Sequence, residues 1–182
     1  KTFDLIIVGG GINGAGIARD AALRGYSVAL LEQADFAYGT SSRSSRLIHG
    51  GLRYLEQYNF GLVFEGVSER YLLSKLARHL VRPLPFVFPV FKGQRRLFTV
   101  KLGLWLYDIL ALFRNYRNHK NLSRNQIQEA LPGIRKEGLQ GGVLYYDYQT
   151  NDARLVLENI LSAQDLGAVA LNYCQVRSMT KN

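Results

Sequence analysis

The stretch FDLIIVGGGINGAGIARDAALRGYSVALLE, residues 3–32, predicts a single supersecondary unit. It begins with an apolar run at residues 3–8, as expected for a strand of a parallel sheet that is buried on both faces. Small and apolar residues then recur at helical spacing as far as Leu23, and Gly25 follows as a C-terminal cap. Residues 26–32 form a second apolar run, so the stretch predicts a right-handed βαβ unit.

Three glycines with the spacing G-x-G-x-x-G join the first predicted strand to the helix. Gly9 permits a tight turn, Gly11 lets the backbone approach a pyrophosphate, and Gly14 lets the helix pack closely against the strand. The free N–H groups and positive dipole of the helix N-terminus favour the phosphates. The predicted dinucleotide contacts are therefore Gly9, Gly11, Ile12, Asn13 and Gly14, and the alternative is a glycine-rich turn without a ligand.

Glu32 ends the second predicted strand, 23 residues after Gly9. A carboxylate in this place accepts hydrogen bonds from the ribose of adenosine and disfavours a 2′-phosphate. NADP is therefore not expected, while the fingerprint leaves FAD and NAD both open.

About 100 residues of mixed structure follow before the next predicted strand of the same sheet. Such a long excursion after the second strand is typical of flavoproteins. Within the excursion the periodicity predicts a helix over 60–80, an edge strand or extended segment confined by prolines over 83–91, a helix over 97–113, a polar connection over 115–125 and a short helix that ends before Pro132. Residues 141–149 then predict a strand, residues 151–167 a helix and residues 168–176 a final strand.

The segment GTSSRSSRLIHGGLRYLE, residues 39–56, combines hydroxyl side chains and arginines with a Gly-Gly pair. Together with residues 4–32 and the later DARLVLEN (152–159), it resembles the amino-terminal part of the FAD-dependent glycerol-3-phosphate dehydrogenase family. HGGLRYLE is more specific than the glycine fingerprint, and the resemblance covers most of residues 3–170, with its weakest part at 92–140. Arg46 departs from the family pattern, in which lysine is common, but keeps the positive charge.

The resemblance implies an α/β, Rossmann-like FAD-binding fold of the glutathione-reductase or D-amino-acid-oxidase type, with a long insertion after the second strand and incomplete in this chain. It divides the chain into a first part of the FAD-binding domain at 1–58, an inserted region leading to a substrate or membrane-facing part at 59–140, and a return to the FAD-binding domain at 141–182.

The resemblance also implies roles for individual residues. The hydroxyls expected to contact the FAD pyrophosphate and ribityl chain belong to Thr40, Ser41, Ser42 and Ser45. The residues expected to line the flavin are Arg46, Leu47, Ile48 and His49, with the Gly50–Gly51 backbone against the isoalloxazine, where a Cβ would interfere. Arg53 and Tyr54 would face the substrate, the guanidinium suiting a phosphate dianion, and His49 is a candidate for proton transfer. Val176 is placed at the adenine edge.

Most of these residues have a simpler interpretation. The hydroxyl-rich loop could be a solvated helix cap, and His49 a hydrogen-bonded structural histidine. Arg53 could pair with Glu56 one helical turn on, while Tyr54 and Val176 could serve in packing. Asp152 and Arg154 are expected to be helix-start and surface residues.

The implied reaction is oxidation of sn-glycerol 3-phosphate to dihydroxyacetone phosphate, with a hydride passing from C2 to flavin N5 and the electrons to a quinone. Two alternatives stay open: an FAD-binding fragment without turnover, which fits a 182-residue piece of a longer enzyme, and another FAD-dependent amine or hydroxy-acid oxidase.

The charge of the chain is concentrated, since residues 92–120 carry a net +6 of the total +9. Their apolar centre around Trp105 has cations at both ends, so this block could lie on an anionic membrane or pack as an ordinary helix. Its longest apolar run, residues 102–113, is shorter than the roughly 20 residues of a transmembrane helix. No nucleic-acid recognition motif is found.

A single cysteine, Cys174, and three scattered histidines predict neither a disulfide nor a metal site. No signal peptide is expected. The protein is expected in the cytoplasm, peripherally on the inner face of the cell membrane, and a homodimer is left open.

Overall fold

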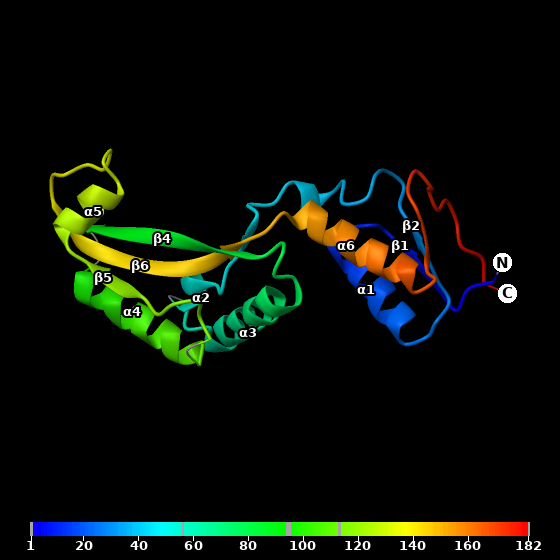
Figure 1. Cartoon of the computed structure of the whole chain (residues 1–182), viewed down its shortest axis with the longest axis horizontal. Helices are drawn as coiled ribbons and strands as arrows, with labels where there is room; N and C mark the ends of the chain where they lie inside the picture. Colours follow the sequence, from blue (N-terminus) through cyan, green and yellow to red (C-terminus); the bar gives the residue numbers. More distant parts are fainter. Residues whose placement is uncertain (1, 56, 94–95, 113, 182) are drawn as a thin grey trace. The chain divides into compact units, whose positions relative to one another are not determined.

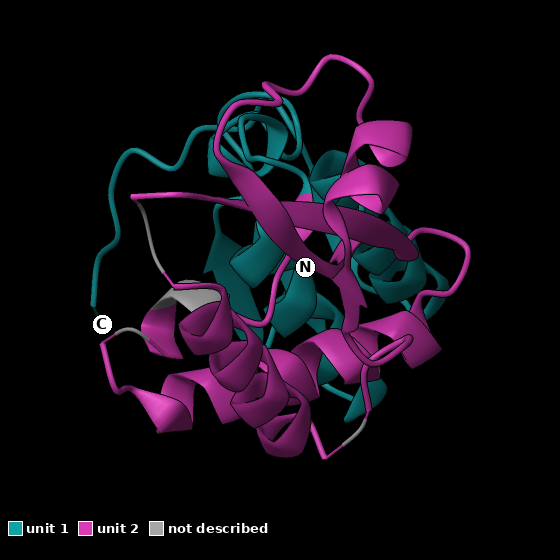
Figure 2. Ribbon diagram, turned by 90° about the vertical axis from the view of Figure 1, so that its left-hand side faces the viewer, with its two compact units in different colours: residues 1–46, 150–182 teal, residues 47–149 magenta. Residues whose placement is uncertain are grey.

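The structure, a computed structural model, describes residues 2–55, 57–93, 96–112 and 114–181, and at Leu52 and Arg53 it describes the backbone alone. The chain forms two compact units, coloured separately in Figure 2. The first comprises residues 1–46 and 150–182, and the second residues 47–149. The chain passes from the first unit to the second after Arg46 and returns at Thr150. These two residues are hydrogen-bonded, since the Thr150 N–H donates to the Arg46 carbonyl oxygen at 3.0 Å.

A parallel sheet with the order β1-β2-β7 organises the first unit. Its strands are β1 (Leu5–Val8), β2 (Val28–Leu31) and β7 (Val169–Leu171). Helix α1 (Ile12–Leu23) connects β1 to β2, and α6 (Asp152–Asp165) packs beside it (Figure 1). The predicted βαβ unit, the α/β fold and the long insertion after the second strand are confirmed.

The core of this unit lies between the sheet and the two helices. Ala15 and Ala18 of α1 are fully buried, and their small side chains let Val156 and Ile160 of α6 approach closely. The prediction that the first strand is buried on both faces is wrong for the described residues, since Ile6 is 59% exposed. Both helices pack on the face that contains Ile7, which leaves Ile6 and Val8 of β1 exposed on the opposite face.

An antiparallel sheet organises the second unit. Its two long strands are β4 (Arg82–Phe91) and β6 (Leu139–Gln149). The short strands β3 (Leu47–Ile48) and β5 (Lys120–Leu122) pair with the other edge of β6. Strand β4 is therefore an edge strand, as its prolines predicted, because proline cannot donate to a second neighbour.

The helices of the second unit, among its described residues, are α2 (Leu52–Leu55), α3 (Phe60–Leu76), α4 (Leu97–Leu110) and α5 (Arg124–Ala130). Helix α3 ends four residues before the predicted limit, because the N–H groups of Leu80 and Val81 turn back onto the Ala77 carbonyl.

The compact units divide the chain at other points than the predicted domains. Residues 47–58 belong with the second unit, in which β3 pairs with β6 and α2 packs on α3. The strand predicted at 141–149 is the centre of the antiparallel sheet and does not return to the first sheet. Its alternation of polar and aromatic residues suits a sheet of this kind, whereas β1 and β2 are uniformly apolar.

Two further elements differ from the prediction. The polar connection at 115–125 contains β5, and the final strand spans 169–171 only.

Candidate functional site

The glycine turn of the first unit has the geometry that a phosphate-binding turn requires. Gly9 has φ +110°, a conformation that side chains disfavour. A Cβ on Gly14 would lie 1.9 Å from the Gly9 carbonyl oxygen, so only glycine lets α1 approach β1 this closely. Around Gly11 the space is open, because a Cβ there would meet nothing nearer than the Ser41 hydroxyl at 3.8 Å. The roles predicted for Gly9 and Gly14 thus have a direct steric cause.

Helix α1 presents an N-terminus without acidic residues in its first turn and without a side-chain cap on Gly11. The N–H of Ile12 donates to the Ser41 Oγ at 3.3 Å. Ile12 and Asn13 are both exposed. The positive end of the helix dipole and a nearby hydroxyl therefore meet at one place, which suits a phosphate group.

Glu32 is held rigidly where β2 ends. Its Oε2 accepts a hydrogen bond from the Gly10 N–H at 2.6 Å, and its Oε1 accepts one from the Ala34 N–H at 2.8 Å. Each carboxylate oxygen keeps a further lone pair. Glu32 therefore keeps the capacity to accept a hydrogen bond from a ribose hydroxyl, and that contact stays a prediction.

A cavity of about 150 Å³ lies next to Glu32 in the first unit. Its lining residues are Val8, Gly9, Leu31, Glu32, Gln33, Cys174, Gln175 and Val176. Val176 lines this cavity, and its contact with an adenine stays a prediction. The sequence analysis missed Gln33, Cys174 and Gln175, although the carboxyl ends of neighbouring parallel strands meet at one edge, a rule that could have found them.

The hydroxyl-rich loop forms the short 3₁₀ helix η1 (Thr40–Ser42). Only Ser41 of the four predicted hydroxyls is hydrogen-bonded at the start of α1. The Ser42 hydroxyl donates to the carbonyl oxygens of Tyr38 and Gly39 and so closes its own turn. Thr40 and Ser45 are exposed.

The neighbouring Ser44, which the prediction omitted, connects the loop to α6 by a hydrogen bond to Asp152. Its Oγ also accepts from the Arg46 N–H at 3.0 Å, and the exposed Arg46 has φ +59°. Asp152 and Arg154 occupy the first turn of α6, as predicted, and Arg154 pairs with Glu158 at 2.7 Å.

The predicted residues from Leu47 onward belong to the second unit. Leu47 and Ile48 are half-buried and pair with Gln149 and Tyr148 of β6. The exposed His49 accepts a hydrogen bond at Nδ1 from the Gly51 N–H at 3.2 Å. The β3 backbone and this local turn therefore determine how the imidazole is presented.

The Gly50–Gly51 pair follows at once. A Cβ on Gly50 would lie 2.1 Å from the Tyr107 hydroxyl. Gly51 has φ +70°, and a Cβ on it would lie 2.4 Å from the Tyr54 ring. Packing inside the second unit therefore already requires the two glycines, in addition to any approach to a flavin. Tyr54 is 36% exposed, so it serves in packing with part of its surface free.

The Arg53 side chain and Glu56 lie outside the described residues, so neither the substrate role of Arg53 nor its alternative ion pair is placed by the structure. No group of metal-ligating side chains was found in the described parts of the chain.

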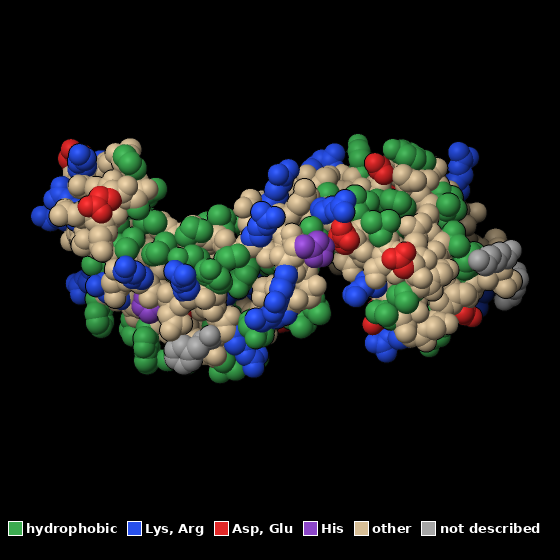
Figure 3. All heavy atoms as spheres, in the orientation of Figure 1, with side chains coloured by type: hydrophobic (Ala, Val, Ile, Leu, Met, Phe, Trp, Pro, Cys, Tyr) green, Lys and Arg blue, Asp and Glu red, His purple; other side chains and the backbone are tan. Residues whose placement is uncertain are grey.

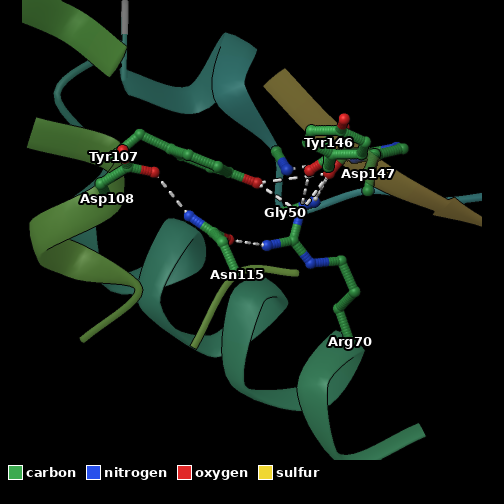
Figure 4. A network of polar contacts seen from close by, with 9 residues as sticks. Gly50, Arg70, Tyr107, Asp108, Asn115, Tyr146 and Asp147 are labelled. Atoms are coloured by element: carbon green, nitrogen blue, oxygen red, sulfur yellow. Dashed lines mark hydrogen bonds and ion pairs between the residues drawn. The ribbon is translucent and has the colours of Figure 1, made fainter. Parts of the chain in front are cut away.

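A buried polar network lies beneath the Gly50–Gly51 turn (Figure 4). It contains Gly50, Arg70, Tyr107, Asp108, Asn115, Tyr146 and Asp147, and it extends to His119. Arg70 is 1% exposed and Asp147 5%. Burial raises the pKa of Tyr107, and the partial burial of Tyr145 together with the charge of Asp147 raises the pKa of that phenol. The sequence analysis missed this network because its members are far apart in the chain.

Comparisons with known proteins agree with the geometry of the first unit. A model of the family described as FAD dependent oxidoreductase matches residues 4–182. The chain is 49% identical over 181 residues to a glycerol-3-phosphate dehydrogenase of Synechocystis sp., covering 98% of this chain and 33% of that protein. It is 46% identical over 177 residues to an alpha-glycerophosphate oxidase of Streptococcus pneumoniae, covering 95% of this chain and 29% of that protein.

A solved structure gives the same result. The X-ray structure of the glycerol-3-phosphate dehydrogenase from Bacillus halodurans complexed with FAD matches with a TM-score of 0.72 and 37% identity, covering 100% of this chain and 28% of that chain. The chain spans about a third of the length of the curated relatives it matches.

Proposed function

This chain belongs to the FAD-dependent oxidoreductase family, and on that premise we propose that the whole protein oxidises sn-glycerol 3-phosphate to dihydroxyacetone phosphate with FAD as its cofactor. The observation that carries the proposal is the match of nearly the whole chain to relatives named for glycerol 3-phosphate and glycerophosphate oxidation. The glycine turn, the open α1 N-terminus and the cavity beside Glu32 support the FAD part of the proposal.

Residues of the first unit fit the two polar parts of FAD. The N-terminus of α1, with Gly11, Ile12, Asn13 and the Ser41 hydroxyl, would hold the pyrophosphate. Glu32 would accept from the adenosine ribose, with Val176 beside the adenine. Bound FAD supplies the hydride acceptor, a chemistry that no protein side chain provides.

The remaining site residues rest on the resemblance. Thr40, Ser42, Ser45 and Arg46 would lie along the cofactor, although the Ser42 hydroxyl already bonds its own turn. Leu47, Ile48 and the Gly50–Gly51 backbone would line the flavin. Arg53 would bind the substrate phosphate and Tyr54 would lie beside it.

The His49 ring is arranged to donate a hydrogen bond to the substrate and not to remove a proton from it. When neutral, an imidazole that accepts a hydrogen bond at Nδ1 carries its proton on Nε2. Because the Gly51 N–H bonds to Nδ1 at 3.2 Å, Nε2 would present an N–H donor to the substrate. The base that removes the C2 hydroxyl proton is therefore another group in this proposal.

Helix α4 supports a membrane-surface location. One side of it is packed in the second unit, where Leu104 and Tyr107 are buried. The opposite side carries Phe98, Leu102 and Trp105 at helical spacing, and they are 74%, 52% and 57% exposed. Figure 3 shows hydrophobic side chains on the outer surface in this region with Lys and Arg side chains beside them. The buried side agrees with ordinary helix packing, and the exposed apolar side supports the proposed contact with a membrane.

An exposed apolar stripe flanked by cations suits an anionic lipid interface. Within the described residues, none of the helices is long and apolar enough to cross a membrane, and Gln94, Arg95 and Phe113 of this block lie outside them. Full-length protein should co-sediment with anionic vesicles more than with zwitterionic ones, and a variant with serine at the three exposed positions should lose most of this binding. Equal sedimentation of both proteins would contradict the location. The quinone acceptor and a homodimer rest on the resemblance alone.

Visible absorption spectroscopy of the purified full-length protein tests the reaction. Anaerobic addition of sn-glycerol 3-phosphate should bleach the flavin bands, while its mirror image sn-glycerol 1-phosphate should leave them unchanged. Bleaching by an amine or a 2-hydroxy acid instead would identify another oxidase of the same fold. Protein purified without flavin that also fails to bind added FAD would contradict the cofactor. Flavin bands in the 182-residue chain that the substrate does not bleach would identify a binding fragment.

A further inference from the structure

The Gly50–Gly51 turn lies directly on a buried carboxylate. The Gly50 N–H donates to the Asp147 Oδ1 at 3.2 Å, across 97 positions of the chain. Gly50 is buried, and a Cβ on it would come within 2.6 Å of Val67 and 2.1 Å of the Tyr107 hydroxyl. Packing and a hydrogen bond thus restrict the backbone at this one residue from different sides.

Asp147 is in turn held by two side chains from different helices. Arg70 of α3 donates to its Oδ1, and the Tyr107 hydroxyl of α4 lies 3.3 Å from the same oxygen. Arg70 also donates to the Tyr107 oxygen at 2.7 Å. The Asp147 carboxylate oxygen is therefore fixed in place by a triangle of bonds (Figure 4).

Arg70 also fills a gap in the sheet. Strand β5 pairs with β6 up to Leu144, and β3 pairs with it from Tyr148 onward, so residues 145–147 have no strand neighbour on that edge. The guanidinium lies at this gap, where it donates to the Tyr146 carbonyl oxygen at 3.4 Å and to Asn115. The guanidinium thus donates a hydrogen bond to β6 where a neighbouring strand would otherwise donate one. Through Asp147 it also connects β6 to the Gly50–Gly51 turn.

A buried ion pair of this kind is weak evidence for stability as such. Two charges removed from water lose hydration that their attraction only partly returns, and apolar side chains of the same volume often stabilise equally well. What such a pair supplies is a single arrangement of its neighbours, because any other leaves a charge unpaired. Here the ion pair includes Asp147, which accepts from the Gly50 N–H and so restricts the backbone of that residue. The next residue, Gly51, donates its N–H to the His49 ring.

We propose that Asp147, held by Arg70 and Tyr107, is a positioning residue that fixes the Gly50–Gly51 turn and, through the Gly51 N–H, the ring of His49. The proposal rests on the proposed function for its catalytic consequence, since the turn and His49 are the parts expected against the flavin and substrate. Its structural content, a backbone turn held from beneath by one carboxylate, is independent of the substrate.

The test compares two buried aspartates of the same network in the full-length holoenzyme. Asp147→Ala removes the acceptor of the Gly50 N–H, whereas Asp108→Ala removes the partner of Asn115 and His119 at the other end. Asp108 is equally buried, 5% exposed, and is also hydrogen-bonded to side chains of the network, so it is a matched control. Hydrogen exchange of residues 47–55 should rise in D147A and stay near the wild-type rate in D108A.

Asp147→Asn keeps an oxygen for the Gly50 N–H and should give an intermediate exchange rate, which also covers the case in which D147A does not fold. With sn-glycerol 3-phosphate, kcat should fall roughly 10- to 100-fold in D147A with a smaller change in KM, as for a misplaced reactive group, and stay near wild type in D108A. Equal exchange of residues 47–55 in D147A, D147N and wild type, or the same increase in D108A, would overturn the proposal. If wild-type protein does not oxidise the substrate, the proposed function fails while the exchange comparison still decides the positioning role.

Discussion

The two compact units are stabilised by different kinds of contact. In the first, alanines of α1 pack against apolar residues of α6 and the sheet, and among the described residues of this unit Thr150 is the only buried polar one. In the second, a buried arginine and two buried aspartates lie among the helices and strands, next to a small apolar cluster around Val63, Val67 and Tyr107. Both units pack apolar residues, and the second also buries charges that must stay paired.

The units also differ in how far apart their decisive residues lie in the chain. Gly9 and Gly14, which decide the approach of α1 to β1, are five residues apart. Arg70 and Asp147 are 77 residues apart, and Gly50 and Asp147 are 97. The glycine turn of the first unit can therefore be explained from residues close together in the chain, whereas the Gly50–Gly51 pair of the second unit depends on residues far from it in the sequence.

The largest expected effect comes from removing the buried arginine. Arg70→Met leaves the Asp147 carboxylate without its charged partner, and breaking a buried pair in this way costs about 3–5 kcal/mol. Hydrogen exchange of the slowest amides in the second unit of the full-length protein measures this loss, and the first unit should be much less affected. Arg24→Met is the control, because the Arg24–Asp20 pair is on the surface and its removal should not measurably change exchange. An R70M protein with wild-type exchange would show that the charges do not hold the second unit together.

A glycine in the first unit should give the next effect. Gly14→Ala places a methyl group 1.9 Å from the Gly9 oxygen, and since backbone must move to relieve the clash, a loss of about 1–3 kcal/mol or more is expected. Gly16→Ala is the control in the same helix, because nothing lies within 4 Å of its Cβ and alanine favours a helix by about 1 kcal/mol. Exchange in the first unit should thus rise for G14A and fall for G16A. The same direction for both variants would mean that α1 does not touch β1 as described.

These contrasts show which parts of the molecule can be predicted from sequence. The βαβ unit, the glycine turn and the place of Glu32 were predictable, because each depends on residues close together in the chain or on a uniform apolar run. The edge position of β4 was also predictable, since proline excludes a second strand. The assignment of β6 to a sheet was not, because its partners β3, β4 and β5 come from three distant segments.

The site shows the same limit. The Gly50–Gly51 pair was noticed and assigned to contact with a flavin, but the sequence gives no sign that Tyr107 and Asp147 already require it. Helical periodicity over 60–80 does not mark Arg70 as a buried residue. Arg70 is nevertheless buried with Val63 and Val67, because Asp147 supplies the opposite charge.

A smaller effect should appear as a pH dependence. Burial raises the pKa of Tyr107 in the folded protein above its usual value of 10.0, which applies to the unfolded chain. Stability from the neutral phenol is therefore complete below pH 10 and is lost as the pH rises from there through the folded pKa, since only the unfolded chain releases the proton. Tyr107→Phe should cost about 1.5 kcal/mol at neutral pH, where it loses a bond to a charged group. Its free energy of unfolding should then fall less steeply above pH 10, as measured by exchange in the second unit. Parallel pH profiles for both proteins would contradict a buried Tyr107 phenol.

The smallest effect should be equal in the two units. Asn151 caps α6 in the first unit by accepting from the Arg154 N–H at 3.2 Å, and Asn59 caps α3 in the second by accepting from the Leu62 N–H at 3.3 Å. Because a cap satisfies a helix end locally, Asn151→Ala and Asn59→Ala should each cost about 1 kcal/mol, whichever kind of core the helix packs against. Each loss should be confined to the unit that carries the helix, and exchange of that unit is the measurement. A clearly larger loss for N59A would mean that the buried charges amplify a local defect of α3, since Arg70 reaches Asp147 only while that helix holds its register.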